Sequence, residues 1–119
     1  MTAARRVAPT TRRNETRELT HPIRAALNVL PGVRVWRNTQ GYDRRTKTVY
    51  GLAVGSADLV GLVDSRFVAL EVKWPDEKPD EDQVAWLATV RELGGFACVV
   101  HSVDEALAAV ARCRAGASE

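Results

Sequence analysis

The first regular pattern along the chain is that of a helix. Apolar residues recur at steps of three and four and so share one helix face, namely Leu19, Ile23, Ala26, Leu27 and Leu30. Pro22 interrupts this pattern, because proline fits a helix only in its first turn or at a kink. We therefore expect two helical pieces or one helix that starts near Thr20, and Pro31 and Gly32 end it.

The middle of the chain has the two-residue period of β-strands. Residues 33–37 alternate apolar and basic side chains, which predicts a half-buried strand. An apolar run at 59–63 and a stronger strand pattern at 67–73 flank a short turn, so these segments are expected to form a β-hairpin. The polar segment 38–47 is interpreted as a loop.

Two capping boxes mark helices in the last third of the chain. Asp80 followed by Gln83 three residues later predicts a helix over 80–94, which a pair of glycines ends. The continuous apolar run 96–100 is typical of a strand that is buried on both faces. Ser102 opens the second capping box and a final helix.

The order of these elements predicts an α/β fold. A strand–helix–strand unit from 67–73 to 96–100 requires a parallel strand pair with a right-handed crossover, whereas the hairpin is antiparallel. The expected core is therefore a mixed central sheet flanked by helices, in the order α-β-β-β-α-β-α. Residues 1–12 are expected to be a flexible basic arm, 13–114 a single domain and 115–119 a tail.

The composition is that of one ordinary globular domain. The chain has 119 residues, of which 45% are hydrophobic and 27% charged, and this excludes a collagen, a disulfide scaffold and a coiled coil. Its apolar runs are too short to span a bilayer, and no apolar stretch follows the N-terminal arginines as in a signal peptide. Cys98 and Cys113 are too few and too far apart for a metal knuckle, so a reducing cytoplasm is the expected location.

Charge divides the chain into a basic and an acidic half. Residues 1–50 hold eleven Arg and Lys against three acids, whereas residues 51–119 hold six against twelve. A basic region of this kind predicts a face for a polyanion. For the arginines at the very N-terminus, the alternative is a solvated tail.

The predicted strand 67–73 carries an unusual pair of charged residues. Glu71 and Lys73 are two residues apart, so both lie on one side of the strand, and the alternating apolar residues face the core. If the hairpin turn is tight, Asp58 at the start of the partner strand comes close to this pair. A carboxylate and an amine at the end of a buried hairpin cost desolvation energy unless they are paired or bind a ligand.

Two carboxylates and a lysine at one end of a sheet suit a divalent cation. Mg²⁺ prefers oxygen ligands, so the expected metal ligands are Asp58, Glu71 and the backbone carbonyl of Val72. Such a cation lowers the pKa of a bound water and neutralises charge on a phosphate, and Lys73 would orient that water or stabilise the developing charge. The alternative interpretation is an ordinary salt bridge between Glu71 and Lys73.

Other motifs surround this group in a distinctive order. Gly55-Ser-Ala-Asp58 ends thirteen residues before Glu71, and Gln83 opens a capped helix ten residues after Lys73. This ordered set resembles the VRR-NUC domain of the PD-(D/E)XK nuclease superfamily, in its small stand-alone form of phages and prophages.

Two further segments, Val35-Trp-Arg-Asn38 and Gly94-Gly-Phe-Ala-Cys-Val-Val-His-Ser102, are similar to the same domain. The resemblance covers roughly residues 15–110. One departure is the Ser-Ala-Asp motif, where the superfamily name implies Pro-Asp. Proline is no metal ligand, so this departure leaves the carboxylate in place.

The resemblance implies a restriction-endonuclease-like core that hydrolyses phosphodiester bonds in DNA with Mg²⁺, or Mn²⁺ in its place, and no organic cofactor. It assigns Asp58 and Glu71 to the metal, Lys73 to the water or transition state, and Gln83 to the edge of the active site.

The superfamily often adds a glutamate from the first helix to the site. Glu15 and Glu18 are both candidates here, because Pro22 blurs the helical register. Glu18 is closer to the apolar pattern and is the preferred choice.

DNA is the partner that the basic region and the resemblance share. The expected DNA-binding residues lie in or beside the polar loop: Arg37, Asn38, Gln40, Arg44, Arg45, Lys47 and Ser56. Family members of this size are similar to homodimeric enzymes that resolve four-way junctions, so the resemblance implies branched DNA and a homodimer. The alternative is a DNA-binding or partner-dependent subunit with little activity of its own.

Overall fold

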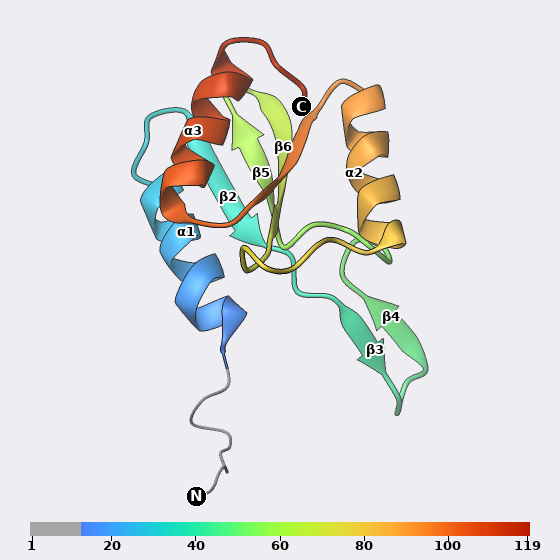
Figure 1. Ribbon diagram of the computed structural model, residues 1–119. Coiled ribbons are helices and arrows are strands. Elements are labelled where there is room, and N and C mark those ends of the chain that lie inside the picture. The colour runs from blue at the N-terminus through green and yellow to red at the C-terminus, as the bar shows by residue number, and fades with distance from the viewer. Residues whose placement is uncertain (1–12) are drawn as a thin grey trace, which may run out of the picture.

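The computed structural model describes residues 13–119, and a four-stranded sheet is its centre (Figure 1). The strands lie in the order β2 (Val33–Arg37), β5 (Leu59–Val63), β6 (Arg66–Val72) and β7 (Phe96–Val100). The pairs β2–β5 and β5–β6 are antiparallel, whereas β6–β7 is parallel. The predicted hairpin and mixed sheet are therefore confirmed. The arm expected at residues 1–12 lies outside the described residues.

Helices cover both faces of the sheet (Figure 1). Along the chain they are η2 (Thr16–Thr20), α1 (His21–Leu27), α2 (Glu81–Glu92) and α3 (Val103–Arg114). The first helix consists of two pieces, as Pro22 predicts: a π-helical turn precedes α1, and Pro22 lies in the first turn of α1. Within residues 13–119, none of these helices has the length and apolar character needed to cross a membrane.

Two apolar clusters hold these layers together. The larger one joins α1 and α3 to the sheet face that carries Val68, Leu70 and Val72. The smaller one packs α2 on the opposite face, against Ala69 and Ala97. The alternation predicted for β6 is thus confirmed, and it places Glu71 on the same face as α2.

Both predicted N-caps begin helices, and the capping box is complete only at α2, because the Glu105 side chain accepts its bond from the His101 N–H and not from that of Ser102. The Asp80 carboxylate accepts a hydrogen bond of 2.9 Å from the Gln83 backbone N–H, and the Gln83 side chain accepts one of 2.9 Å from the Asp80 N–H. The Ser102 hydroxyl likewise accepts a bond of 3.1 Å from the N–H of Glu105 at the start of α3. These bonds satisfy N–H groups that have no partner within the helix.

The segment 38–47, expected to be a loop, supplies the first strand and the turn of a two-stranded ribbon. β3 (Gly41–Asp43) pairs with β4 (Thr48–Tyr50) in antiparallel register, and the ribbon projects away from the main sheet (Figure 1). Most of its side chains are exposed on both faces. Because no core selects one face, the sequence lacks the alternation that reveals a half-buried strand.

The close packing of β2 on β5 yields a test of the sheet. A Cβ added to Gly61 in β5 would overlap the carbonyl oxygen of Arg34 and lie 2.7 Å from the Cα of Val35. Gly61→Ala is expected to lower the free energy of unfolding by about 1–3 kcal/mol, because the backbone of β2 must move. Urea denaturation measures this loss, and Leu62→Ala, at an exposed neighbour, is the control. Equal losses in both variants would contradict the predicted strand spacing.

Candidate active site

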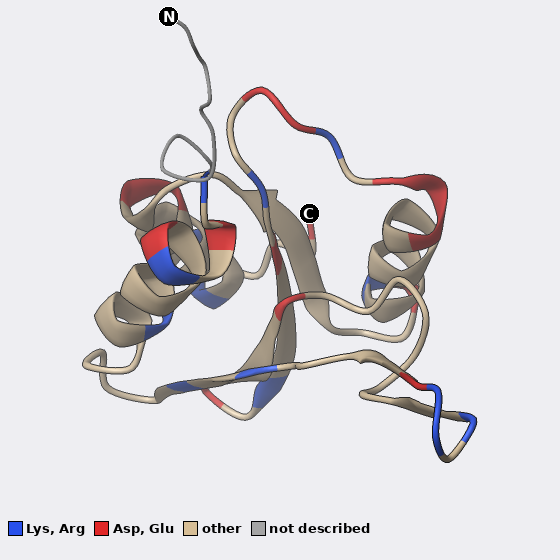
Figure 2. Ribbon diagram, turned by 90° about the horizontal axis from the view of Figure 1, so that it is seen from below, with Lys and Arg blue, Asp and Glu red and all other residues tan. Residues whose placement is uncertain are grey.

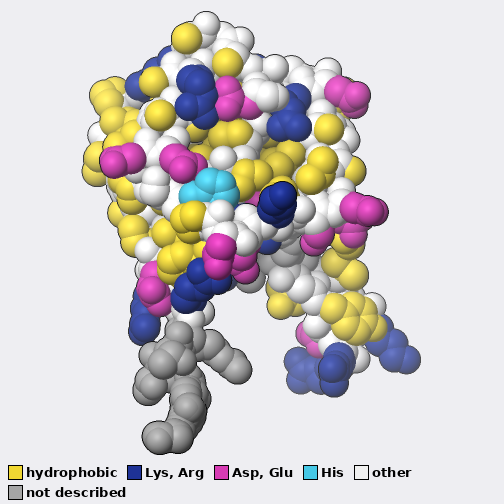
Figure 3. All heavy atoms as spheres, in the orientation of Figure 1, with side chains coloured by type: hydrophobic (Ala, Val, Ile, Leu, Met, Phe, Trp, Pro, Cys, Tyr) yellow, Lys and Arg dark blue, Asp and Glu magenta, His cyan; other side chains and the backbone are white. Residues whose placement is uncertain are grey.

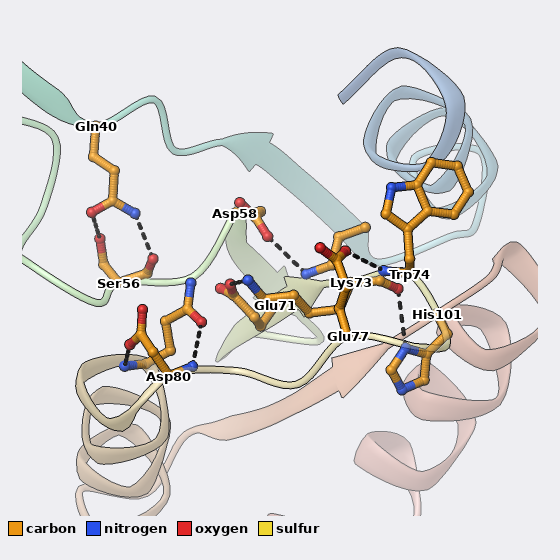
Figure 4. A network of polar contacts seen from close by, with 11 residues as sticks. Gln40, Ser56, Asp58, Glu71, Lys73, Trp74, Glu77, Asp80 and His101 are labelled. Atoms are coloured by element: carbon orange, nitrogen blue, oxygen red, sulfur yellow. Dashed lines mark hydrogen bonds and ion pairs between the residues drawn. The ribbon is translucent and has the colours of Figure 1, made fainter. Parts of the chain in front are cut away.

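The hairpin register brings three predicted site residues to one end of the sheet. Leu59 pairs with Leu70, so Asp58 and Glu71 follow as neighbours at the open end of the β5–β6 pair. Lys73 comes directly after β6 and lies on the same side as Glu71 (Figure 4). The meeting of Asp58, Glu71 and Lys73 that the sequence predicts is found in the structure.

Asp58 is held in place by hydrogen bonds to the backbones of two different segments. Its carboxylate accepts a hydrogen bond of 2.8 Å from the N–H of Val72, and its backbone carbonyl accepts one of 2.8 Å from the N–H of Asn38. Burial raises the pKa of Asp58, whereas the Val72 N–H, Lys73 and Arg37 act in the opposite direction. The Val72 carbonyl faces the same side of β6 as its N–H, and therefore faces Asp58.

Among the described residues, the buried side-chain atom without a hydrogen-bond partner belongs to Glu71. The residue is 1% exposed, and its Oε1 has no hydrogen-bond partner. Its Oε2 lies 3.7 Å from the Nζ of Lys73, which is too long for a close ion pair. Burial, and then the charge of Asp58, raise the pKa of Glu71 to about 8. Lys73 and the backbone of Asp58 only partly offset these effects on the pKa, so a salt bridge with Lys73 alone does not satisfy this carboxylate.

The oxygen atoms of Asp58, Glu71 and Val72 are the groups here that could hold a divalent cation. Within residues 13–119, no three His, Cys, Asp or Glu side chains form a ready metal cage. Mg²⁺, however, commonly uses one or two carboxylates and keeps several waters. Asp58, Glu71 and the Val72 carbonyl supply such a set, and the unpartnered Oε1 would gain a ligand bond.

Glu15, at the start of the first helix, lies within electrostatic range of Asp58 and Glu71. Burial raises its pKa, and the nearby carboxylates of Glu77 and Asp58 contribute to the shift. Glu18 instead accepts a hydrogen bond of 2.9 Å from the N–H of Asn14. The preference for Glu18 stays a prediction, with Glu15 as the alternative. The π-helical turn that precedes α1 changes the register on which that preference rested.

Gln83 lies at the start of α2, and its side chain is already engaged. Its oxygen bonds the Asp80 N–H in the capping box, which leaves its amide nitrogen for other partners. The role predicted for Gln83 at the edge of the site stays a prediction.

Three of the expected DNA-binding residues bond to one another instead. The Asn38 amide donates bonds of 2.7 and 2.9 Å to the Ser56 hydroxyl and the Ala57 carbonyl. Gln40 donates one of 2.6 Å to the Ser56 carbonyl (Figure 4). Ser56 is only 1% exposed, so its predicted contact with DNA is wrong. We call Asn38, Gln40 and Ser56 the brace, because it ties the ribbon to the segment that ends at Asp58.

The basic residues of the predicted loop occupy two places. Arg37 ends β2 close enough to affect the pKa of Asp58. Arg44, Arg45 and Lys47 lie at the exposed turn of the ribbon, and Figure 2 shows this turn in blue, whereas the beginning of α2 is red. In the structure, basic residues of the first half of the chain therefore gather at the ribbon turn, and acidic residues of the second half gather at the start of α2.

His101 supports the site in a way that the sequence did not reveal. Its Nδ1 lies 3.0 Å from the carbonyl oxygen of Lys73 (Figure 4). A carbonyl oxygen only accepts hydrogen bonds, so Nδ1 carries the proton. His101 thereby holds the end of β6 against the end of β7. The sequence shows only that His101 directly follows a buried strand. That position does not reveal whether its side chain binds the neighbouring strand or the start of α3.

No protein-family model matches the chain, and no curated protein matches it in sequence. The VRR-NUC resemblance therefore stays an expectation drawn from its motifs.

The raised pKa of Glu71 predicts how stability varies with pH. The folded protein retains a proton between the ordinary pKa of 4.5 and about 8, so it binds more protons than the unfolded chain in this range. The free energy of unfolding must then fall as the pH rises from 5 to 8. Glu71→Gln, which cannot ionise, should make this decline shallower and stabilise the metal-free protein at pH 8 by on the order of 2 kcal/mol.

Urea denaturation in EDTA at pH 5 and pH 8 measures this effect. Glu92→Gln, an exposed glutamate at the end of α2, is the matched control and should keep the wild-type pH dependence. A Glu71→Gln protein with the same decline as wild type would show that Glu71 ionises normally.

Proposed function

We propose that this protein is a divalent-cation-dependent nuclease that hydrolyses phosphodiester bonds in DNA. The single observation that carries the proposal is the buried, unpartnered Oε1 of Glu71 beside Asp58 and Lys73. Desolvating a carboxylate next to a second one is unfavourable, and a purely structural site has no reason to retain it. A cation at this position would offset both effects.

Each residue has a role that follows from its position. Asp58, Glu71 and the Val72 carbonyl would hold the cation, which when bound supplies charge neutralisation at the phosphate and a more acidic water. Lys73 places a positive charge next to Glu71 and would orient the attacking water or stabilise the developing negative charge.

Two neighbours would position the reacting groups. Arg37, which lies within electrostatic range of Asp58, would draw the phosphate of the substrate to the site. His101 fixes the backbone of Lys73 through its 3.0 Å contact and so limits where the amine can move.

DNA is the substrate class that the surface charge favours. The basic residues beside and beyond the site would bind phosphates, and the motif resemblance points to the same substrate. The restriction-endonuclease-like arrangement, the four-way junction and the homodimer belong to this proposal as predictions. A protein that only binds DNA is the weaker alternative, because two carboxylates facing the phosphates oppose binding unless a cation accompanies them.

A cleavage assay tests the proposal. Linear, nicked, flap and four-way-junction DNAs are incubated with Mg²⁺ or Mn²⁺, and products are resolved on denaturing gels. Wild type should cut at least one of these DNAs, and Lys73→Ala should lower the rate by a factor on the order of 100 or more. Lys78→Ala, an exposed lysine of the following loop, should cut at the wild-type rate.

Asp58→Asn completes this series. It removes a negative charge that would repel DNA, so binding should be retained while cleavage is lost. No cleavage by wild type, or full cleavage by both Asp58→Asn and Lys73→Ala, would overturn the assignment of the active site.

A further inference from the structure

The β3–β4 ribbon is the part of the fold that lacks a packing partner. Its two strands have three residues each, and an isolated ribbon of this length is only marginally stable in water. Yet it exposes large apolar side chains, with Tyr42 56% and Val49 59% exposed. Exposed apolar groups on a projecting element indicate that it binds something.

The brace fixes this ribbon to the candidate active site. Asn38 and Gln40 lead into β3, and both bond to Ser56, two residues before Asp58. Ser56 also donates a bond of 2.7 Å to the Ala53 carbonyl, which shapes the return of the chain from β4. The position of the ribbon relative to Asp58 is therefore determined by these partly buried hydrogen bonds.

One face of the ribbon is apolar and hollow. Tyr42 and Val49 are register partners and project from the same face. Together with Val54 they line a hollow of about 280 Å³, whose other lining residues are Gln40, Gly41 and Gly55. This volume is close to the lower end for ligand sites and suits one planar ring rather than a large ligand. The polar side-chain groups among these lining residues are the Tyr42 hydroxyl and the Gln40 amide, which is bonded to Ser56.

The turn of the ribbon carries positive charge at the far end of the element that lines this hollow. Arg44, Arg45 and Lys47 are exposed at this turn. Figure 3 shows dark blue side chains at the tip of the ribbon, beyond the yellow side chains of its strands. The Asp43 carboxylate accepts bonds of 2.9 and 3.3 Å from the N–H groups of Arg45 and Thr46. These bonds hold the turn in one conformation.

We propose that the ribbon binds a single-stranded segment of DNA next to the cleaved phosphate. One unpaired base occupies the hollow and stacks on Tyr42, and the basic turn binds the backbone of the same strand. Aromatic platforms beside basic groups are the recurring solution for single strands, because every base has a stacking face. A continuous duplex offers phosphates to the turn but no free base to the hollow.

This inference rests on the proposed nuclease function and refines its substrate. The DNA would need an unpaired segment near the cut, as in a flap, a splayed arm or an open junction. A second copy of the chain fits less well, because two ribbons brought together would place six basic side chains close to one another.

Base removal combined with substitution of Tyr42 tests the site. Binding of a labelled Y-shaped DNA is measured by fluorescence anisotropy, with Ca²⁺ in place of Mg²⁺ so that the DNA stays uncut. An abasic residue is placed at each single-stranded position near the fork in turn. Tyr42→Thr keeps a strand-forming residue but removes the ring, and Tyr42→Phe keeps the ring.

The proposal expects one sensitive position. There, loss of the base should weaken binding about tenfold for wild type and Tyr42→Phe, and less than about twofold for Tyr42→Thr. Tolerance of abasic residues at every position, equal sensitivity in Tyr42→Thr, or equally tight and Tyr42-dependent binding of continuous duplex would each overturn it. Altered sedimentation of free Tyr42→Thr would assign the face to a second copy and likewise overturn it.

These results are separable from those of the cleavage assay. Sensitivity to Tyr42 without any cleavage would remove the nuclease function and keep the binding site. If flap and duplex are instead cleaved at equal rates that Tyr42→Thr does not change, the nuclease function is kept and the binding site for an unpaired base is removed.

Discussion

The burial of Glu71 beside Asp58 is the constraint on which the structure of the candidate site at the end of the β5–β6 pair depends. Two carboxylates share a poorly solvated edge of the sheet, and their nearest cation, Lys73, is 3.7 Å from Glu71 and leaves Oε1 unsatisfied. Such an arrangement raises the free energy of the ionised, metal-free protein. The pairing of β5 with β6 and the hydrogen bond from the Val72 N–H to Asp58 hold the two carboxylates in this arrangement.

The neighbouring strands enforce this geometry. The hairpin register sets Asp58 against Glu71, and the parallel strand β7 covers the other edge of β6. The Lys73 N–H donates a bond of 3.1 Å to the Val100 carbonyl, and His101 holds the Lys73 carbonyl. Both hydrogen-bonding groups of that backbone are thus used. A cation would find its ligands already in position, which is the usual requirement for a site that performs chemistry rather than mere binding.

The accuracy of the sequence-based predictions follows from how strongly burial restrains each segment. The hairpin, its register and the meeting of Asp58 with Glu71 were predictable, because alternation along β6 permits one orientation only. The β3–β4 ribbon was missed, since exposed strands carry no such pattern. The sequence alone does not decide between Glu15 and Glu18, because a π-helical turn changes the helical register before α1. Ser56 was misassigned because a hydroxyl that braces a turn and one that binds phosphate have the same signature in sequence.

The measurement that tests the central claim most directly is calorimetric titration of the protein with Mn²⁺. The account predicts a single site in wild type, binding at least about tenfold weaker in Glu71→Gln and in Asp58→Asn, and wild-type affinity in Glu92→Gln. Absence of saturable binding to wild type, or equal affinity in all four proteins, would contradict the claim that these carboxylates form a cation site.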